Sequence, residues 1–361
     1  MAGVADLDAM LHDLERLVSV ESPSHDVDAL SKSAEAVAQL ILERTGAAAT
    51  IVDGPDGPHV HWSGGGAPRV LVLGHHDTVF PIGSLAQRPF RVADGKATGP
   101  GVFDMKGGIV QAIHAVAALE DAAGVEMLFT ADEEVGSDSS RALLEERALA
   151  CGNVLVLEPS ADGGAVKTGR KGTGTFDVVV RGRAAHAGLD PEKGVNALIE
   201  AAHQVLTIKA FGDPAAGTTV TPTVAHAGTA DNVIPAEARL RIDVRVTGPE
   251  EKRRVESLMQ GLSPVDGSAE IEVRGEINRP PMPEAASATL FPIARQIMPG
   301  LQGVAVGGGS DGNFTAARGV PTLDGLGAVG GGAHADHEYL LIETMVERAA
   351  LVEGLLRRLL S

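Results

Sequence analysis

Residues 69–77 read R-V-L-V-L-G-H-H-D, an apolar strand pattern that ends directly in polar residues. A continuous apolar run of this kind is typical of a strand covered on both faces, as in a parallel sheet. The runs V-E-M-L-F-T at 125–130 and N-V-L-V-L-E-P-S at 153–160 have the same form, and helical patterns separate all three. This order predicts an α/β domain whose mostly parallel sheet is covered by helices.

A different pattern begins near residue 172. Alternating apolar and polar residues predict strands, and the elements follow the order β-α-β-β-α-β up to about residue 280. This is the order of a ferredoxin-like α+β domain. We therefore expect residues 172–280 to form an inserted domain, with residues 1–171 and 281–361 as the two parts of the first domain.

The chain has 361 residues, a formal net charge of −18 and an aromatic content of 3%. Nucleic acids and anionic membranes attract basic surfaces, and nucleic acids also use stacking rings, so this composition argues against both partners. There is one cysteine, Cys151, and we find neither a signal-peptide pattern nor an apolar run long enough for a membrane span. We expect a soluble, cytoplasmic protein.

The stretch T-A-D-E-E-V-G-S at 130–137 places Asp132, Glu133 and Glu134 at the end of a predicted buried strand. Adjacent carboxylates repel one another and are costly in apolar surroundings unless positive charge lies among them. A solvated acidic loop is the simpler interpretation of such a run. A ligand site is the alternative, because ligands of parallel sheets gather at the carboxyl ends of the strands.

Other polar residues also follow predicted strands or occupy tight loops. His75 ends the first strand, and Asp77 leaves the chain on the same side two residues later. Asp104 lies in the glycine-rich loop G-P-G-V-F-D-M-K-G-G at 99–108, directly before a predicted helix. Glu158 closes an apolar strand and is followed by proline, a position at which a solvated face is not expected.

A glycine-cushioned histidine, His334, follows in G-G-A-H-A-D-H-E-Y at 331–339, where Asp336 and His337 are alternative ligands. Five nitrogen and oxygen ligands without cysteine suit two metal ions about 3.5–4 Å apart, bridged by a carboxylate. Histidine with carboxylate favours zinc, with cobalt or manganese as alternatives. The candidate metal ligands are His75, Asp104, Glu134, Glu158 and His334.

Taken in order, these motifs resemble those of the M20 metallopeptidase family, and most closely its glutamate carboxypeptidase branch. The resemblance extends over nearly the whole chain. The motifs are H-x-D-T-V at 75–79, G-P-G-x-x-D-M-K-G-G at 99–108, D-E-E-x-G-S at 132–137, L-E-P at 157–159, H-x-x-x-E-Y at 334–339, R-G-R-A-A-H-A-G at 181–188, D-N-V-I-P at 231–235 and N-R-P-P-M at 278–282.

The resemblance implies a zinc-peptidase fold in which residues 172–280 form a lid and dimerisation domain. It also implies two Zn²⁺ ions per chain. His75, Asp104 and Glu158 would hold one ion. Asp104, Glu134 and His334 would hold the other, so that Asp104 bridges the two.

The resemblance also implies catalytic roles. Glu133 would be the general base that deprotonates water and later protonates the leaving amine, and Asp77 would orient His75. His186, on the lid, approaches a substrate carbonyl oxygen in this family, in several members from the neighbouring subunit. A homodimer formed through the lid domain is therefore expected.

The groups that receive the substrate follow from the same resemblance. Asn232, Arg279 and the turn at Gly309 and Ser310 would receive the α-carboxylate, since arginine matches a carboxylate bidentately and a turn offers backbone N–H groups. Arg245 matches an arginine that members cleaving C-terminal glutamate place on the third lid strand.

The function implied is hydrolysis of an amide bond next to a free carboxylate in a small peptide or N-acyl amino acid, with release of a C-terminal amino acid. Glutamate is favoured, although Lys167 lies in a shortened segment and does not align with the lysine of glutamate-specific members. The alternatives are a deacylase of the same family, such as acetylornithine deacetylase or succinyl-diaminopimelate desuccinylase, and a metal-free binding relative. A metal-free binding relative would have lost some of the metal ligands, and all five candidate ligands are present in this chain.

Overall fold

The computed structural model describes residues 6–361, which form two compact units. The first unit comprises the chain up to Arg170 together with Met282–Val306 and Ser310–Ser361. The second comprises Lys171–Pro281 and Gly307–Gly309.

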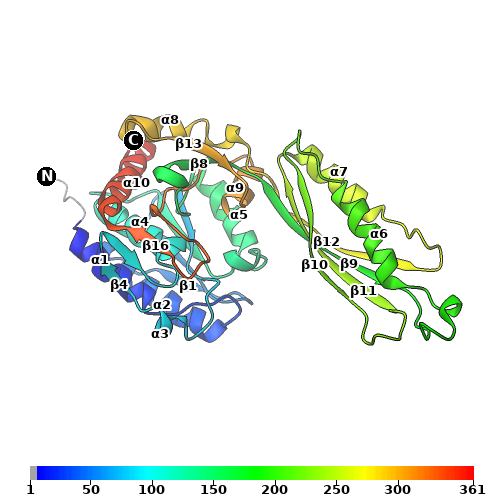
Figure 1. The fold of residues 1–361 in the computed structure, drawn as a ribbon. Coiled ribbons are helices and arrows are strands. Elements are labelled where there is room, and N and C mark those ends of the chain that lie inside the picture. Colours follow the sequence, from blue (N-terminus) through cyan, green and yellow to red (C-terminus); the bar gives the residue numbers. More distant parts are fainter. Residues whose placement is uncertain (1–5) are drawn as a thin grey trace. The chain divides into compact units, whose positions relative to one another are not determined.

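The first unit is built on a six-stranded sheet with the strand order β1-β2-β6-β3-β7-β14 (Figure 1). Strands β6, β3, β7 and β14 run parallel, while β1 and β2 add an antiparallel edge. The prediction of a mostly parallel α/β sheet is therefore confirmed. The strands are Thr50–Val52 (β1), His59–Ser63 (β2), Val70–His75 (β3), Val125–Thr130 (β6), Val154–Val156 (β7) and Thr322–Leu323 (β14).

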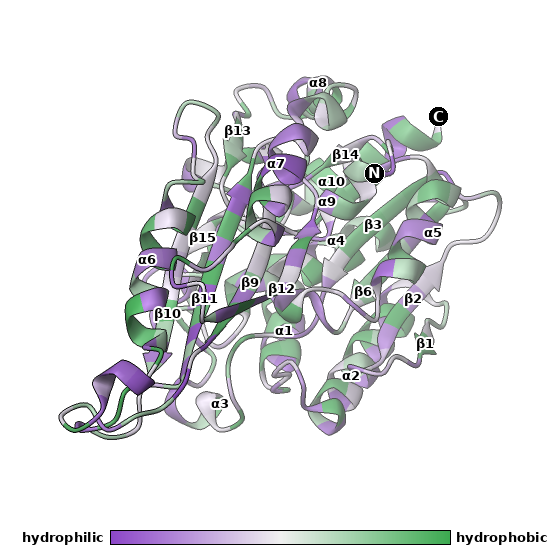
Figure 2. Ribbon diagram, turned by 90° about the vertical axis from the view of Figure 1, so that its right-hand side faces the viewer, coloured by the Kyte–Doolittle hydropathy of each residue, from purple (hydrophilic) through white to green (hydrophobic). Residues whose placement is uncertain are grey.

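Helices cover both faces of this sheet, so that β3 is apolar along its length. Val70 and Val72 belong to a buried cluster with residues of α1, α2, α4 and α10, whereas Leu71 and Leu73 belong to one with residues of α5 and α9. A strand buried on both faces has no solvated position for a polar residue until it ends. Figure 2 shows β3 in the green of hydrophobic residues. The helices of the unit are Leu7–Val18 (α1), Val27–Thr45 (α2), Ser84–Gln87 (α3), Gly107–Ala117 (α4), Arg141–Cys151 (α5), Leu290–Ile297 (α8), Gly312–Ala317 (α9) and Met345–Leu360 (α10).

Strand β2 was not predicted from the sequence. Its five residues, H-V-H-W-S, include three polar ones, and its antiparallel pairing with β1 and β6 identifies it as part of the sheet. The other short strands of the unit are Arg91–Ala93 (β4), Lys96–Thr98 (β5), Val166–Arg170 (β8), Gly303–Val306 (β13), Gly330–Gly331 (β15) and Tyr339–Leu341 (β16). Short helical turns are Val102–Lys106 (η1), Glu133–Val135 (η2), Asp162–Gly164 (η3), Glu284–Ser287 (η5) and Ile342–Thr344 (η6).

The second unit is a four-stranded antiparallel sheet with the order β10-β11-β9-β12. Helices α6 and α7 lie on one face of the sheet and contribute to its buried cluster (Figure 1). Along the chain the order is β9-α6-β10-β11-α7-β12, so the ferredoxin-like prediction is confirmed. The elements are Gly172–Arg181 (β9), Pro191–Lys193 (η4), Ala197–Lys209 (α6), Thr219–Ala227 (β10), Glu237–Val246 (β11), Pro249–Gln260 (α7) and Glu270–Arg279 (β12).

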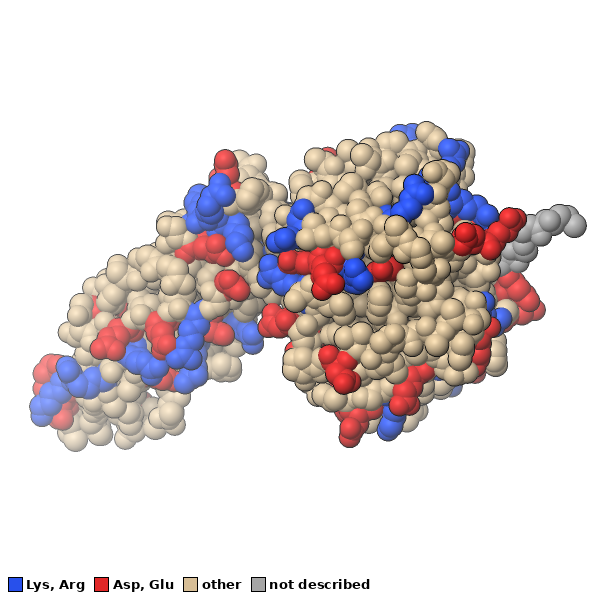
Figure 3. All heavy atoms as spheres, turned by 180° about the vertical axis from the view of Figure 1, so that it is seen from behind, with Lys and Arg blue, Asp and Glu red and all other residues tan. Residues whose placement is uncertain are grey.

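Two further properties concern the surface and the cysteine. No helix within residues 6–361 is both long and apolar enough to cross a membrane. On the face shown in Figure 3, the basic side chains lie among acidic ones rather than in a separate zone. The single cysteine, Cys151, is buried as a free thiol at the end of α5.

Candidate metal centre

The ends of neighbouring parallel strands bring the acidic and histidine side chains together. His75 is the last residue of β3, Glu133 and Glu134 follow β6 in η2, and Glu158 follows β7 by two residues. Because β6, β3 and β7 are adjacent and parallel, their carboxyl ends lie at one edge of the sheet. Asp104 reaches the same place from the turn η1, directly before α4.

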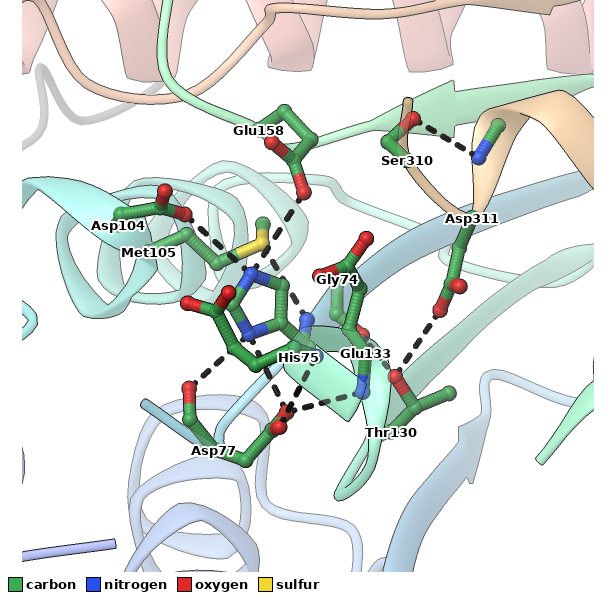
Figure 4. Close-up of polar contacts among 12 residues, drawn as sticks. Gly74, His75, Asp77, Asp104, Met105, Thr130, Glu133, Glu158, Ser310 and Asp311 are labelled. Carbon is green, nitrogen blue, oxygen red and sulfur yellow. Dashed lines mark hydrogen bonds and ion pairs between the residues drawn. The ribbon is translucent and has the colours of Figure 1, made fainter. Parts of the chain in front are cut away.

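His75 is 1% exposed and presents its two ring nitrogens to different partners (Figure 4). Nδ1 lies 3.0 Å from the backbone oxygen of Asp77 and 3.3 Å from its Oδ1. Nε2 lies 3.3 Å from Asp104 Oδ1 and 3.6 Å from Glu158 Oε1. Asp77 therefore orients the ring, and Nε2 is the nitrogen directed at the carboxylates.

Asp104 lies between two histidines. While its Oδ1 faces His75, its Oδ2 lies 3.4 Å from His334 Nε2, which is also 3.2 Å from Glu134 Oε2. Two groups of possible metal ligands result, and they share Asp104: His75, Asp104 and Glu158 form one, and Asp104, Glu134 and His334 form the other.

The donor set fits divalent cations. It consists of two imidazoles and three carboxylates, which are ligands that zinc accepts. Two buried oxygens of these ligands, Asp104 Oδ1 and Glu134 Oε1, have no hydrogen-bond partner among the described residues. Buried carboxylate oxygens normally have hydrogen-bond partners, so these two atoms leave room for a cation as their partner. His337 and Asp336, the alternatives to His334, belong to neither group within residues 6–361.

The electrostatics of the centre reflect its density of negative charge. Burial alone would lower the pKa of His75, but the surrounding carboxylates, Asp104 foremost, hold that pKa well above its usual value. Hydrogen bonds to Asp104 and Glu134 raise the pKa of His334 to about 11, and burial raises the pKa of Glu134 itself. Without a metal, protons on the two histidines supply positive charge among the carboxylates. Bound cations would supply that charge instead, and the histidines would release their protons.

The acidic stretch after β6 is held by specific acceptors. Asp77 accepts hydrogen bonds from the backbone N–H groups of Glu133 (3.3 Å) and Glu134 (3.2 Å) and from Ser24 Oγ (2.7 Å). Asp132 turns away and accepts from the backbone and hydroxyl of Ser139 through Oδ2. The carboxylates of Asp132 and Glu134 therefore have different partners, Ser139 and His334. The solvated-loop interpretation does not apply to a turn in which Asp132 is fully buried.

Sequence reasoning missed several residues that support these ligands. Arg170 lies 3.4 Å from Glu158 Oε2 and pairs bidentately with Asp324, at 2.6 and 3.0 Å. Glu338 accepts from the backbone of the loop that carries Asp104. Two signals in the sequence could have pointed to them. Glu338 is the glutamate of the motif H-x-x-x-E-Y at 334–339, and Arg170 is a charged residue at the end of a strand.

In the second unit the structure places His186 beside Asn232. His186 forms a bridge with Val233, and the N–H of Ala187 donates to the backbone oxygen of Asn232 (2.9 Å). The ring of His186 is exposed, and its Nδ1 accepts from Gly188 N at 3.1 Å.

Arg245 and Arg279 lie at one end of the second unit. Both are register partners of Thr173 on the intervening strand β9, so their side chains share one face of the sheet. Gly309 packs beside Arg279 and Thr173, because a Cβ added there would lie 3.2 Å from Arg279 Cδ and 3.0 Å from Thr173 Cγ2. Arg245 also pairs with Asp243, at 2.8 Å.

Ser310 belongs to the first unit, in the turn before α9. Its hydroxyl donates to Asp324 Oδ2 (2.6 Å), and its N–H donates to Asn313 Oδ1 (2.9 Å). The structure thus links Ser310 through Asp324 to Arg170.

Comparison with known proteins gives one family. The model of Peptidase family M20/M25/M40 matches residues 71–358. The chain is 32% identical over 369 residues to carboxypeptidase G2 from Pseudomonas sp. (strain RS-16), which covers 96% of this chain and 88% of that protein. It is 31% identical over 325 residues to succinyl-diaminopimelate desuccinylase from Xanthomonas oryzae pv. oryzae, which covers 82% of this chain and 85% of that protein.

Solved structures share the fold. A tripeptidase from Staphylococcus aureus matches with a TM-score of 0.79 at 20% identity, over 99% of both chains. An M20 family metallo-carboxypeptidase from Sulfolobus solfataricus matches with a TM-score of 0.75 at 16% identity, over 96% of this chain and 98% of the other.

Single substitutions should separate the two candidate ligand groups. We expect His75→Ala and His334→Ala each to retain about one zinc ion per chain, because each removes a ligand of one group only, whereas Asp104→Asn should lose both. The measurement is zinc content by mass spectrometry after dialysis against a zinc buffer. His337→Ala is the matched control and should keep the wild-type content; loss of zinc there, with His334→Ala unaffected, would reverse the assignment.

Proposed function

Since the chain belongs to the M20/M25/M40 peptidase family of metal-dependent hydrolases, we propose that it is a di-zinc hydrolase. It cleaves an amide bond next to a free carboxylate and releases a C-terminal amino acid, with glutamate favoured, from a small peptide or an N-acyl amino acid. The observation that carries this proposal is that both ligand groups share Asp104. Cobalt or manganese are alternative metals. When bound, such cations polarise a carbonyl and lower the pKa of water.

Glu133 is the proposed general base. It precedes the ligand Glu134, and Asp77 fixes the backbone of both residues. Figure 4 draws the contact of the Glu133 N–H with Asp77, whose carboxylate also contacts His75. In the proposed reaction, the Glu133 carboxylate takes a proton from the attacking water and gives it to the departing amide nitrogen, so the leaving amine is neutral when the C–N bond breaks.

His186 is the proposed donor to the substrate carbonyl oxygen. Its Nδ1 accepts hydrogen bonds from the backbone of Gly188 and Leu189, both at 3.1 Å, so the neutral ring carries its proton on Nε2. An exposed Nε2–H suits an acceptor that develops negative charge during attack.

We assign the α-carboxylate of the substrate to Asn232, Arg279, Gly309 and Ser310. Support comes from the neighbouring positions of Arg279 and Gly309. Arg245 is proposed to bind the side-chain carboxylate of glutamate, because it lies on the same sheet face as Arg279, about 10 Å away across β9.

Lys167 supports a preference for an acidic side chain. It lines a cavity of about 400 Å³ in the first unit, together with Val304 and Val306. Burial and the nearby Arg170 lower its pKa, and its ammonium group has no hydrogen-bond or ion-pair partner among the described residues. Such a lysine is suited to pair with an anionic group of a bound ligand.

Desuccinylation of an amino acid is the second candidate, because a relative of comparable coverage is a succinyl-diaminopimelate desuccinylase. In this reaction water also attacks an amide carbonyl, but one carboxylate of the substrate belongs to the succinyl group that is removed. Acetylornithine deacetylation belongs to the same class of alternatives.

A substrate panel tests the proposal. We expect kcat/KM for an N-acyl-glutamate, a folate-like substrate or a dipeptide ending in glutamate to exceed that of the glutamine counterpart by at least about tenfold, or about 1.4 kcal/mol. Assays with zinc or cobalt should include N-acetylornithine and succinyl-diaminopimelate. Turnover of only those two would establish the second candidate, and no turnover of any amide by fully metallated protein would reject the hydrolase.

Glu133→Gln should keep its metal but lose turnover by about 10²–10⁴-fold, because the amide cannot accept the proton of water. The measurements are zinc content and kcat on the best substrate of the panel. Glu134→Gln is the matched control and should lose metal; the opposite pattern would exchange the roles of the two residues.

The proposed homodimer would form through the second unit. Helix α6 exposes apolar side chains on one face, with Leu198 51%, Ile199 58% and Leu206 69% exposed. Strand β10 lies at the edge of its sheet, where unpaired backbone groups are available to a second chain. A covering copy of this chain removes both features from water.

Leu206→Asp should therefore convert the dimer to a monomer, since burying the new carboxylate in the interface is costly. It should also lower kcat if His186 acts across the dimer. Light scattering after gel filtration measures the mass. Leu258→Asp, on α7 of the same unit, is the control and should stay dimeric; a wild-type protein that runs as a sharp monomer would contradict the proposal.

A further inference from the structure

Glu338 is a buried carboxylate whose side chain holds a loop of backbone. It is 2% exposed. Its Oε1 accepts hydrogen bonds from the N–H groups of Phe103 (2.9 Å) and Asp104 (2.8 Å), and its Oε2 accepts from Gly101 N (2.8 Å). Three backbone donors of one loop thus converge on one carboxylate.

The backbone of Glu338 belongs to the loop that carries the second histidine. Ala335 N donates to Gly332 O (2.9 Å) and closes the turn that contains His334, and Glu338 N donates to Ala335 O (3.1 Å) and closes the turn that follows directly. The fit is close, because a Cβ added to Gly332 would lie 3.1 Å from the Glu338 backbone. His334 itself has a φ of 62°, in the left-handed region that few side chains adopt without support.

Glu338 therefore joins the two loops that carry Asp104 and His334. We propose that Glu338 is a positioning residue of the metal centre, which sets the bridging carboxylate and the histidine at the separation that divalent cations need before any cation binds. This inference rests on the proposed function, because it concerns the ligands assigned there.

Glu338 is not itself a ligand. Both of its oxygens are engaged by backbone N–H groups, and it belongs to neither ligand group within the described residues. Burial raises the pKa of Glu338 to about 7, while the three backbone N–H donors act in the opposite direction and favour its ionised form. The buried Lys106, whose Nζ donates to Val20 O (2.7 Å), also attracts Glu338 electrostatically.

The three converging donors require a carboxylate. Ionised glutamate offers only acceptors on both oxygens, whereas glutamine offers one acceptor oxygen and an NH₂ group that donates. Glu338→Gln keeps the shape of the side chain but leaves at least one buried N–H of the loop unpaired. We expect the loop to shift and Asp104 to move away from His334.

The test is zinc affinity. Mutation of residues that orient metal ligands through hydrogen bonds typically changes metal affinity by about 10–100-fold. We expect Glu338→Gln to weaken zinc binding within that range. Metal-free protein is titrated with zinc alone in competition with a coloured chelator. The visible absorption of the cobalt-substituted protein is the second measurement, because it reports ligand arrangement even when the site is saturated.

Glu200→Gln is the matched control. Glu200 is a 2% exposed carboxylate in the second unit that accepts from Val265 N (3.0 Å), Asp266 N (2.9 Å) and Gln204 Nε2 (2.7 Å). The same substitution there removes comparable hydrogen bonds, so it should lower thermal stability while leaving zinc affinity and the cobalt spectrum unchanged.

Each outcome of these measurements either supports or overturns the positioning role of Glu338. Wild-type zinc affinity and an unchanged cobalt spectrum in Glu338→Gln overturn the inference, as does an equal loss of affinity in Glu200→Gln. If Glu338→Gln does not fold, Glu338→Asp, which keeps the charge but shortens the side chain, must show the weakened affinity instead. Failure of the wild-type protein to bind two zinc ions would instead refute the proposed di-zinc centre, which separates the two failures.

Discussion

The carboxylate of Asp104 lies between the imidazoles of His75 and His334, and the geometry of the whole centre depends on holding it there. Each of its oxygens faces one histidine, at 3.3 and 3.4 Å. Each oxygen of a carboxylate has two lone pairs, so Asp104 can face both histidines and still accept further contacts. The backbone N–H groups around Asp104 bond to Glu338 and leave the Asp104 side chain for the centre.

The fold brings these carboxylates together at one edge of the sheet and buries them there, which is energetically costly. Adjacent parallel strands end at one edge, so the residues that follow β3, β6 and β7 converge there. Helices bury the sheet on both faces, and Glu158 and Asp132 are as buried as many core residues. Carboxylates in such surroundings need positive partners. Arg170 is one such partner, for Glu158. Among the oxygens that face the two histidines, Asp104 Oδ1 has no hydrogen-bond partner in the described residues.

Much of the fold could be predicted from the sequence, because the periodicity of apolar residues directly reflects which faces of an element are covered. The continuous run of β3 and the alternation of β11 are examples. Strand β2 could not be predicted, since its burial comes from pairing with β6 rather than from its own composition. The residue types of the centre were also predictable, because apolar packing gives no reason for a histidine or glutamate directly after a buried strand. Glu338 and Asp324 were not, because each acts through backbone or side-chain groups that are far away in the sequence.

The sequence by itself determined the order of the elements, the family to which the chain belongs and the chemical types of the candidate ligands, since these depend on local patterns and on motif order. Only the tertiary structure decided which atoms face one another. It directs Nε2 of His75 at Asp104, places His334 rather than His337 beside Glu134, and pairs Glu338 with a loop more than 230 residues earlier in the chain. These choices depend on distances of a few ångströms between segments remote in sequence, which packing sets and which no local pattern records.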